Sequence, residues 1–447
     1  TGEVAGKEES AILRRARSRK ISRAAQAPAY TPPSPLPAPA VPPVVVGAGP
    51  AGLFAALVLA QAGLRPILLE RGRPVERRKA DVERFWATGE LDLTSNVQFG
   101  EGGAGAFSDG KLNTGTRDPR HRFILETLVS CGAPEDILID AKPHVGTDYL
   151  HTVLVNLRRR LLELGTDIRF ESRLADLDIR DGAVQGVAGE RGSYPAEAVV
   201  LATGGVSYPA TGSTGDGHRM AAEAGHTVTP LQGSLVPLQG IIAAGIPCVR
   251  LQGLSLRNVA LTVFENNKKI YTDFGELLFT HFGVSGPLVL SASAHMRHFT
   301  KKRYRLEIDL KPALDEQQLD KRLLADFAKY ANHDFQNGLD DLLPQKLIPV
   351  VIELSGIPGR QKVHDLTREQ RQSLLWVLKH FPVEVSAPCP VTDAIVTSGG
   401  VKVGEVDPKT MESKLVKNLY FAGELLDTDA YTGGFNLQIA WATGRLA

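Results

Sequence analysis

The sequence contains little cysteine: its 447 residues include only Cys131, Cys248 and Cys389, and no two of them form a C-x-x-C pair. This spacing excludes a thioredoxin-type dithiol and a local zinc knuckle, and it is typical of a protein in a reducing cytoplasm. The 11 histidines also lack a metal-ligand spacing such as H-E-x-x-H. We therefore expect thiols that pack as small hydrophobic groups, no metal site and a cytoplasmic location.

An excess of charge of one sign is also lacking. The formal net charge is +1, from 51 Lys and Arg against 50 Asp and Glu. Such a balance provides no long-range attraction to phosphate backbones or anionic lipids. The sequence thus predicts neither a nucleic acid nor a membrane as a partner, and it leaves the oligomeric state open.

One long hydrophobic run is present. Residues 44–64, VVVGAGPAGLFAALVLAQAGL, form 21 residues without a charge, which is long enough to span a bilayer. Its glycines, however, fall at the spacing of a nucleotide-binding turn, and a β-rich run follows that ends in Glu70. A buried strand, turn and helix explain both features, so we predict no membrane span here.

The chain is too long for one ordinary domain, and its texture changes along its length. The N-terminal segment is basic and rich in proline, which favours an extended linker without a core. Alternating strands and helices follow, are interrupted by a β-rich and then a helical stretch, and resume at the end. We predict an α/β fold: a flexible tail over 1–42, a Rossmann-like domain over 43–227 and 391–447, and an inserted domain over 228–390, β-rich and barrel-like over 228–312 and helical over 313–382.

The strongest motif is G-x-G-x-x-G at Gly47, Gly49 and Gly52, directly after an apolar strand and at the start of a helix. The first glycine permits a tight turn, the second lets the backbone approach a pyrophosphate, and the third lets helix and strand pack closely. Glu70 ends the next strand, 23 residues after Gly47. A carboxylate there accepts from ribose hydroxyls and disfavours a 2′-phosphate, so NADP is not expected at this site.

Two later segments indicate which dinucleotide binds. AVVLATGG (198–205) is a strand that runs into a glycine turn, a second backbone approach to a large cofactor. In 418–444, a strand and loop lead to a helix that starts near Gly434. A helix N-terminus directed at a flavin would stabilise the negative charge of its reduced form, and an NAD site needs no such contribution. The sequence predicts FAD.

Three segments carry a resemblance to a known family: LATGGVSYPATGSTGDGHRMAAEAGH, GELLFTHFGVSGPLVLSAS and VTSGGVKVGEVDPKTMESKLVKNLYFAGELLDTDAYTGGFNLQIAWATG. They resemble BaiN/YhiN-type NAD(P)/FAD-dependent oxidoreductases, which include aminoacetone oxidase-like enzymes. The resemblance covers about 198–447 together with the fingerprint. It implies non-covalent FAD, with Gly423 and Glu424 near the pyrophosphate and ribityl chain and Gly434, Phe435, Asn436 and Leu437 near the isoalloxazine ring.

The sequence departs from that family after the second strand. Instead of a glycine-rich segment with an Arg-Cys-Asn element, it has NVQFGEGGAGAFSDGKLNTGTRDPR (96–120). That segment, with AKPHVGTDYL (141–150), is similar to a separate group of uncharacterised FAD-dependent dehydrogenases. Its loop N–H groups and a lysine suit an anion. The residues expected at the FAD are Gly47, Ala48, Gly49, Pro50, Ala51, Gly52, Glu70, Arg71, Gly102, Gly103, Ser108, Lys111, Leu174, Ala202, Thr203, Gly204, Gly423, Glu424, Gly434, Phe435, Asn436 and Leu437.

Residues beyond the FAD site are harder to assign, because a flavin performs the hydride chemistry itself. The candidates are Tyr208 in a loop that could cover the ring, His281 as an acid or base, and Tyr431 just before the last helix. For Tyr208 and His281, a purely structural role is the competing interpretation. The leading hypothesis is an FAD-dependent oxidoreductase of the NAD(P)H dehydrogenase or reductase type. It would move a hydride between flavin N5 and a small organic substrate bound between the two domains.

Several alternatives remain open. No second G-x-G-x-x-G unit occurs, so NAD(P)H would dock transiently as co-substrate or be replaced by another donor. Reduction of an activated C=C and oxidation of an amine are both compatible with the family. The chain could instead be an oxidase that passes electrons to oxygen, or a non-catalytic FAD protein that senses redox state. An RNA-modifying flavoprotein is disfavoured because no basic stripe is apparent.

Overall fold

The computed structural model describes residues 11, 15, 30–107, 110–112, 119–140 and 143–447. The chain divides into two compact units. The first comprises Thr1–Leu231 and Thr397–Ala447, and the second is Gln232–Val396. The expected insert was 228–390, so each boundary lies a few residues further along the chain than the sequence predicts.

The first unit is built on a five-stranded parallel sheet of order β17-β7-β1-β2-β3. The register is direct: Val44 lies opposite Ile67 on one side and opposite Val199 on the other. The strands other than the edge strand β3 are short, apolar and largely buried, as expected of a parallel sheet covered on both faces, whereas β3 has two exposed charged residues. Their bounds are β1 Val44–Val46, β2 Ile67–Leu69, β3 Asp167–Arg169, β7 Val199–Leu201 and β17 Leu419–Phe421.

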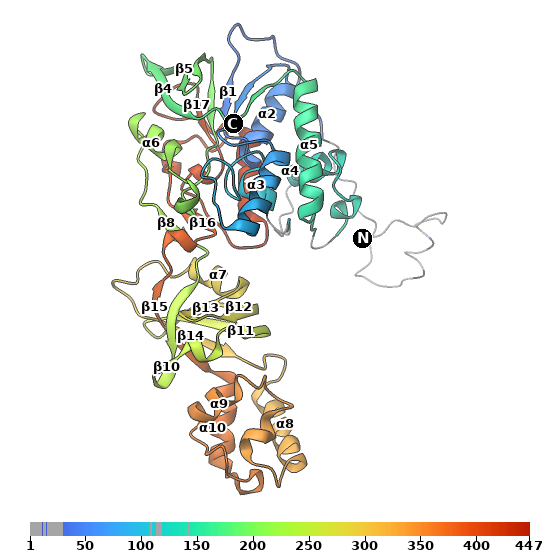
Figure 1. Ribbon diagram of the computed structural model, residues 1–447, viewed down its shortest axis with the longest axis vertical. Coiled ribbons are helices and arrows are strands. Elements are labelled where there is room, and N and C mark those ends of the chain that lie inside the picture. The colour runs from blue at the N-terminus through green and yellow to red at the C-terminus, as the bar shows by residue number, and fades with distance from the viewer. Residues whose placement is uncertain (1–10, 12–14, 16–29, 108–109, 113–118, 141–142) are drawn as a thin grey trace. The chain divides into compact units, whose positions relative to one another are not determined.

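Alternating side chains of these strands point to opposite faces of the sheet and belong to two separate hydrophobic cores. Val45 and Val200 pack under α2, α4, α5 and α11 on one face, whereas Val44 and Leu201 pack against β4, β5, β6 and α6 on the other. Figure 1 shows the helices α2, α4 and α5 on one side of β1 and the strands β4 and β5 on the other. The bounds are α2 Pro50–Gln61, α3 Val75–Thr88, α4 Pro119–Ser130, α5 Thr147–Glu163, β4 Leu174–Arg180, β5 Ala183–Gly189, β6 Gly192–Pro195, α6 Asp216–Glu223 and α11 Phe435–Leu446.

The segment that was expected to belong to the tail contacts the first unit from Tyr30 onward. The Tyr30 ring stacks on Phe123 with 3.8 Å between ring centroids, and its hydroxyl donates to Gln61 Oε1 at 2.9 Å. The N–H of Leu36 donates to the carbonyl of Ala62. The proline-rich stretch is therefore fastened at two points to the end of α2.

The second unit contains a closed barrel. Its strands follow the order β9-β13-β12-β11-β14-β15, and β15 pairs back with β9. The barrel strands are β9 Leu238–Ile242, β11 Ser255–Glu265, β12 Lys268–Phe279, β13 Gly283–Ser285, β14 Tyr304–Asp309 and β15 Phe381–Pro388, with β10 Ile246–Pro247 beside β9. The remaining strands β8 Gln232–Ser234 and β16 Val396–Ser398 lie where the chain enters and leaves this unit.

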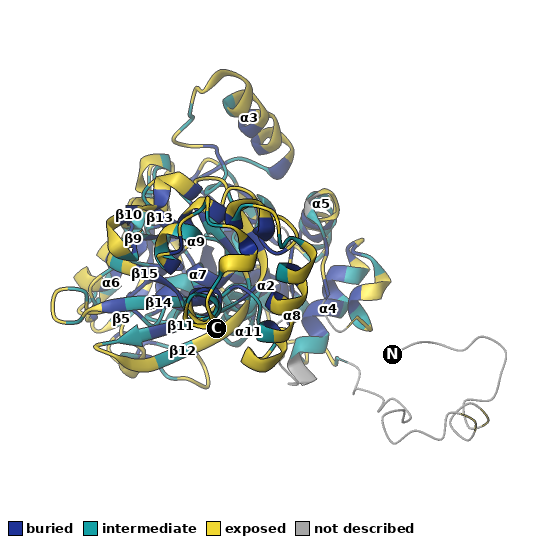
Figure 2. Cartoon of the chain, turned by 90° about the horizontal axis from the view of Figure 1, so that it is seen from below, coloured by how far each residue is buried: buried dark blue, intermediate teal, exposed yellow. Residues whose placement is uncertain are grey.

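Four helices complete the second unit: α7 Pro287–Ser293, α8 Glu316–Lys329, α9 Ile348–Ser355 and α10 Arg368–Lys379. The first residues of α8 and α10 are fixed by capping boxes, Asp315 with Gln318 and Thr367 with Gln370. Figure 2 shows the amphipathic pattern of α8, which presents an exposed surface to solvent. The predicted α/β fold with a β-barrel insert is confirmed.

One helix was not predicted. The sequence analysis assigned no element between Glu70 and residue 95, but α3 occupies Val75–Thr88. In the described part of the chain, no helix is long and apolar enough to cross a membrane. The same residues contain no cluster of three or more His, Cys, Asp or Glu side chains that could hold a metal ion. The three cysteines are free and buried.

Candidate functional site

The turn between β1 and α2 has one open glycine and two enclosed ones. Gly47 has φ +101°, and a Cβ there would lie 2.4 Å from the carbonyl oxygen of Ala202. A Cβ at Gly52 would lie only 1.8 Å from the carbonyl oxygen of Gly47, whereas one at Gly49 would meet none of the described residues within 4 Å. Gly49 thus faces free space at the helix N-terminus, where no side chain caps α2 and Pro50 is its first residue. The N–H groups of the first helical turn are available to an anion.

Glu70 is 5% exposed and lies at the carboxyl end of β2. Its Oε2 accepts from the N–H of Ala48 and its Oε1 from the N–H of Gly72, both at 2.7 Å. A carboxylate oxygen has two lone pairs, so each oxygen can still accept a ribose hydroxyl. The structure thus places the predicted ribose ligand beside the turn and gives it a second task, which is to fix Ala48.

The glycine-rich loop after α3 packs directly on this turn. The N–H of Gly102 donates to the carbonyl of Ala48 at 2.8 Å, and the N–H of Gly103 donates to Gly100. A Cβ at Gly103 would lie 3.3 Å from Cα of Gly49. The expected phosphate donors Gly102 and Gly103 are therefore next to the cofactor turn, but their N–H groups already have acceptors within the protein. They brace the turn.

Two other predicted residues belong to this loop. Ser108 lies outside the described residues. Lys111 is exposed, and its backbone forms an isolated antiparallel bridge with His144. The carbonyl oxygen of Lys111 approaches the start of α11, because a Cβ at Gly434 would lie 2.5 Å from it. The main chain of Lys111 therefore reaches the predicted flavin-facing helix.

The turn after β7 offers a second free space. Ala202 is buried against Gly47, and Gly204 has φ +76° with nothing within 4 Å of a Cβ. The hydroxyl of Thr203 is buried and has no hydrogen-bond partner among the described residues. The Thr203 hydroxyl lies against α6, since a Cβ at Gly217 would lie 1.9 Å from its Oγ1, so the open position of this predicted segment is at Gly204.

Thr397, which sequence reasoning missed, holds this turn through a hydrogen bond to its backbone. It is fully buried, and its Oγ1 accepts from the N–H of Val206 at 2.8 Å. Its own N–H donates to Oε1 of Glu424 at 2.7 Å. Burial raises the pKa of Glu424. Thr397 lies in VTSGG (396–400), whose small residues allow another backbone to approach closely. This segment entered the sequence analysis only as part of the family resemblance.

Gly423 lies where three elements meet. It has φ +74°, a Cβ there would lie 3.0 Å from Cβ of Ala51, and its N–H donates to Oγ1 of Thr443. A Cβ at Gly444 would lie 2.1 Å from the carbonyl oxygen of Ala51. α2 and α11 are therefore in backbone contact, and Gly423 with Glu424 lies beside the first turn of α2.

The start of α11 is shaped by its cap. Gly434 has φ +112°, and Phe435 is the first residue of the helix. Leu437 lies against the glycine-rich loop, since its Cδ2 would be 3.1 Å from a Cβ at Gly105. Asn436, expected at the isoalloxazine ring, instead exchanges two hydrogen bonds with the backbone of Ala430, each 2.9 Å long. Its side chain therefore holds the preceding loop.

Arg71 and Leu174, also expected at the FAD, have different surroundings. The Arg71 guanidinium lies 4.3 Å from the centroid of Phe99 and donates to the carbonyl of Gly212 at 3.2 Å. Burial lowers the pKa of Arg71, opposed by the nearby carboxylate of Asp216. Leu174 is buried at the start of β4 in the core on the opposite face of the sheet from α2.

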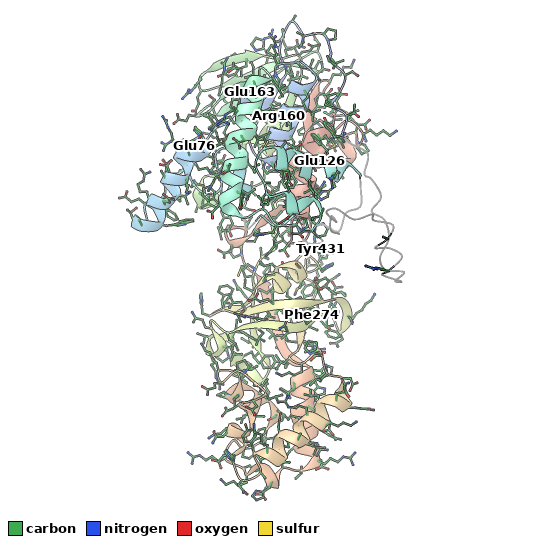
Figure 3. All side chains as sticks on the ribbon, turned by 90° about the vertical axis from the view of Figure 1, so that its right-hand side faces the viewer. Glu76, Glu126, Arg160, Glu163, Phe274 and Tyr431 are labelled. Atoms are coloured by element: carbon green, nitrogen blue, oxygen red, sulfur yellow. The ribbon has the colours of Figure 1, made fainter. Side chains whose placement is uncertain are left out.

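The three candidate catalytic residues differ in setting. Tyr208 has φ +53°, a conformation rare outside glycine and found at constrained loops. Its carbonyl accepts from Thr211, whose own carbonyl accepts from Asn96. Tyr431, labelled in Figure 3, is 41% exposed in the loop before α11. His281 is exposed in the second unit, between β12 and β13.

These features fit FAD. Among the described residues, nothing lies within 4 Å of a Cβ at Gly49, at a helix N-terminus, or at Gly204, and Glu70 can accept from a ribose. The glycine-rich loop and the start of α11 adjoin the same turn. A dinucleotide with a second aromatic end uses all of these positions, whereas a mononucleotide needs only the first.

Similar proteins support this assignment. The HI0933-like protein Rossmann domain family matches residues 142–447, and an FAD binding domain family matches residues 40–82. A 3-dehydro-bile acid delta(4,6)-reductase of Clostridium scindens is 31% identical over 300 residues, which cover 67% of this chain and 71% of that protein. A ribosomal RNA dihydrouridine synthase of Escherichia coli is 27% identical over 421 residues, which cover 90% of this chain and 95% of that protein.

A third relative matches more closely over a shorter stretch. An uncharacterised protein of Clostridium beijerinckii is 50% identical over 162 residues, 36% of this chain and 30% of that protein. This chain therefore spans less than a third of that relative. The predicted BaiN/YhiN-type resemblance and the predicted FAD cofactor are confirmed. The chain belongs to the HI0933-like family of FAD-binding Rossmann-fold oxidoreductases.

Proposed function

We propose that this protein is a reductase that adds a hydride and a proton across a conjugated C=C of a small organic molecule, with NAD(P)H as transient donor. The observation that carries the proposal is the combination of the open Gly49 turn with the start of α11 at the same glycine-rich loop. Two relatives are named for a delta(4,6) reduction and for making dihydrouridine. Both names describe saturation of a C=C, which favours reduction over amine oxidation.

Bound FAD supplies the hydride in this reaction. The chain's own task at the flavin is electrostatic: the N–H groups of the first turn of α11 would stabilise negative charge there. Asn436 keeps the loop at Ala430 in place through its two hydrogen bonds. The hydroxyl of Tyr431 is assigned the proton that the second carbon requires. A phenol suits this step because its O–H is a hydrogen-bond donor that can act as a general acid.

An anaerobic titration tests the donor and the class together. Addition of NADH or NADPH to the FAD-loaded protein should bleach the oxidised flavin, and a steroid enone should restore it without oxygen. Tyr431→Phe should slow the second step and leave the first unchanged. An enzyme that reoxidises only with oxygen and forms peroxide would be an oxidase, and one that neither NADH nor NADPH reduces would contradict the proposed donor.

A second candidate function, reduction of uridine in RNA, is favoured by a basic cluster in the second unit. This cluster is Lys268, Lys269, Lys301 and Arg303, all exposed. Two hydrogen bonds of 3.0 Å join the two segments: the N–H of Asn266 donates to the carbonyl of Arg303, and the N–H of Arg303 donates to the side-chain Oδ1 of Asn266. The nearby Glu265 is paired with Lys302 at 2.8 Å. The cluster could neutralise phosphates, although the sequence analysis expected no nucleic acid partner.

The two candidates make opposite predictions for charge reversal. Lys268→Glu with Lys269→Glu should weaken binding of a ribosomal RNA fragment and lower the salt dependence by about one unit per lost phosphate contact. Lys321→Glu with Arg368→Glu, an equally exposed pair on α8 and α10, serves as control. Equal loss in both variants, or binding by neither variant nor parent, would leave the small-molecule reductase as the function.

A further inference from the structure

Arg78 is a fully buried arginine on a helix that is otherwise largely exposed. Its exposed fraction is 0%, whereas its neighbours Arg77 and Lys79 are exposed. In Figure 2, α3 is largely yellow, with a buried strip on its inner side. Removing a guanidinium from water is costly unless its donors are satisfied. The partners of Arg78 therefore explain why it is buried.

Those partners are main-chain carbonyls of one loop. Nε donates to Asn96 at 2.7 Å, Nη2 to Val97 at 2.6 Å, and Nη1 to Glu101 at 2.8 Å and more weakly to Gly100 at 3.4 Å. The planar fork of arginine can satisfy several acceptors in fixed directions, which a lysine ammonium cannot do equally well. Arg78 thus fixes the conformation of residues 96–101.

The same loop continues into the cofactor turn. Residue 102 directly follows the last carbonyl that Arg78 holds, and its N–H donates to Ala48 at 2.8 Å. Ala48 in turn donates to Glu70 at 2.7 Å. A Cβ at Gly100, which has φ +108°, would lie 2.7 Å from Cδ of Arg78, so the loop is moulded to this side chain. Three hydrogen bonds, connected through the main chain of residues 101–102 and of Ala48, thus link Arg78 to Glu70, the predicted ribose ligand.

A second buried charge secures the base of the loop. Glu101 is 1% exposed and accepts from the N–H of Val75 at 2.9 Å and from Arg158 on α5 at 2.6 Å. Arg158 also pairs with Glu76, which Figure 3 labels on α3. The loop is thereby attached to α3 and α5 as well as to the turn.

We propose that Arg78 is a positioning residue for FAD: it shapes the glycine-rich loop that braces the Ala48–Gly49 turn, and it sets FAD affinity without touching the cofactor. The alternative is a residue that only stabilises the fold. A positioning role predicts that affinity depends on the guanidinium fork itself. A purely structural role predicts that affinity follows overall stability.

The experiment compares Arg78→Lys and Arg78→Ala with Arg84→Lys and Arg84→Ala. Arg84 lies on the same helix, where it is half exposed and 3.3 Å from Asp81. The apo-proteins are titrated with FAD, and the Kd is read from flavin fluorescence and from the visible circular dichroism of bound flavin. We expect Arg78→Lys to bind FAD roughly tenfold or more weakly, because charged hydrogen bonds are lost, and the Arg84 variants to bind like the parent.

Rescue by guanidinium separates the two roles. Millimolar guanidinium should restore FAD affinity and the dichroism to Arg78→Ala, although the same ion lowers the stability of proteins in general. Parental affinity in both Arg78 variants would overturn the proposal. So would weaker binding that guanidinium worsens in step with the thermal midpoint. If Arg78→Ala does not fold, Arg78→Lys decides alone: parental affinity overturns the proposal and weaker binding at unchanged apo-protein stability supports it.

Discussion

The two units differ in where they bury charge. Among the described residues of the first unit, Glu70, Arg78, Asp81 and Glu101 are buried, and all four lie within a short stretch of sequence beside the cofactor turn. In the second unit Asp326 is the one buried charged residue in the part that the structure describes. Its core is otherwise aliphatic and aromatic. Buried charge is expensive to maintain, so its concentration at the turn identifies the region where conformation is specified most strictly.

This comparison predicts that steric changes at the turn abolish cofactor binding. Gly52→Val would place side-chain atoms against the carbonyl of Gly47, where even a Cβ is only 1.8 Å away. We expect FAD affinity to fall by more than about 100-fold, since neither backbone can retreat from a packed strand and helix. Equilibrium dialysis with FAD measures the loss. Gly404→Ala, whose nearest atom is 3.9 Å away, is the matched control.

A large defect in the second unit should have the opposite character. Phe381 is fully buried in the barrel, and Phe381→Ala should lower the free energy of unfolding of this unit by about 3–5 kcal/mol. The FAD Kd should stay within about twofold of the parent under native conditions. Phe274→Ala, at a side chain that is 59% exposed and labelled in Figure 3, should change neither quantity. A large fall in FAD affinity for Phe381→Ala would break the comparison.

The pH dependence should reveal two opposed groups in the first unit. Burial raises the pKa of Glu101 to about 7, so the folded state binds the extra proton and stability falls as pH rises from about 4.5 to 7. Burial lowers the pKa of His218 to about 4, so stability rises as pH increases from about 4 to 6.5. The two trends offset each other in the parent.

Glu101→Gln removes the first trend and leaves the second. Its stability, measured by urea unfolding at several pH values, should therefore rise more steeply between pH 4 and 6.5 than that of the parent. His218→Phe should show the reverse, a decline toward neutral pH. Parallel curves for all three proteins would contradict the assignment of these two groups.

The smallest effect is expected at the buried charge of the second unit. Asp326 accepts from Arg322 at 2.8 Å, one turn away on α8, and Arg322 is half exposed. Asp326→Asn should cost about 1 kcal/mol or less, because such i,i+4 pairs are weak when one partner is solvated. FAD affinity should not change. A measurable shift in the FAD Kd would show that charge in this unit also bears on the cofactor.

The cofactor turn could be predicted from sequence because its requirements are local. Gly47, Gly49 and Gly52 lie in one strand–turn–helix, and Glu70 ends the adjacent strand, so spacing alone brings them together. The fold class followed from the alternation of strands and helices. Gly434 was predicted from the strand, loop and helix start in 418–444, whereas Gly423 was predicted through the family resemblance.

Arg78 could not be identified in this way. VERRKADVERF contains several arginines in a polar segment, and nothing local distinguishes Arg78 from Arg77 or Arg84. Its burial depends on a loop that returns to it from residues 96–101. The family resemblance implies Asn436 at the isoalloxazine ring, which stays a prediction, but the hydrogen bonds of its amide with the backbone of Ala430 could not be predicted from the sequence. Partners of this kind, which are brought together only by the tertiary fold, cannot be recognised from the local sequence pattern.

The contact between α2 and α11 has a consequence for how the protein is made. α2 is synthesised early, whereas β17 and α11 are synthesised only after the whole second unit. Only then can Gly444 of α11 pack on Ala51 of α2, β17 pair with β7, and Thr443 accept from Gly423. A nascent chain that ends before β17 therefore lacks one edge of the parallel sheet and the helix that packs on Ala51. The barrel can fold as an independent unit in the meantime. Loading of FAD is thus expected to follow translation and to report that synthesis has passed α11.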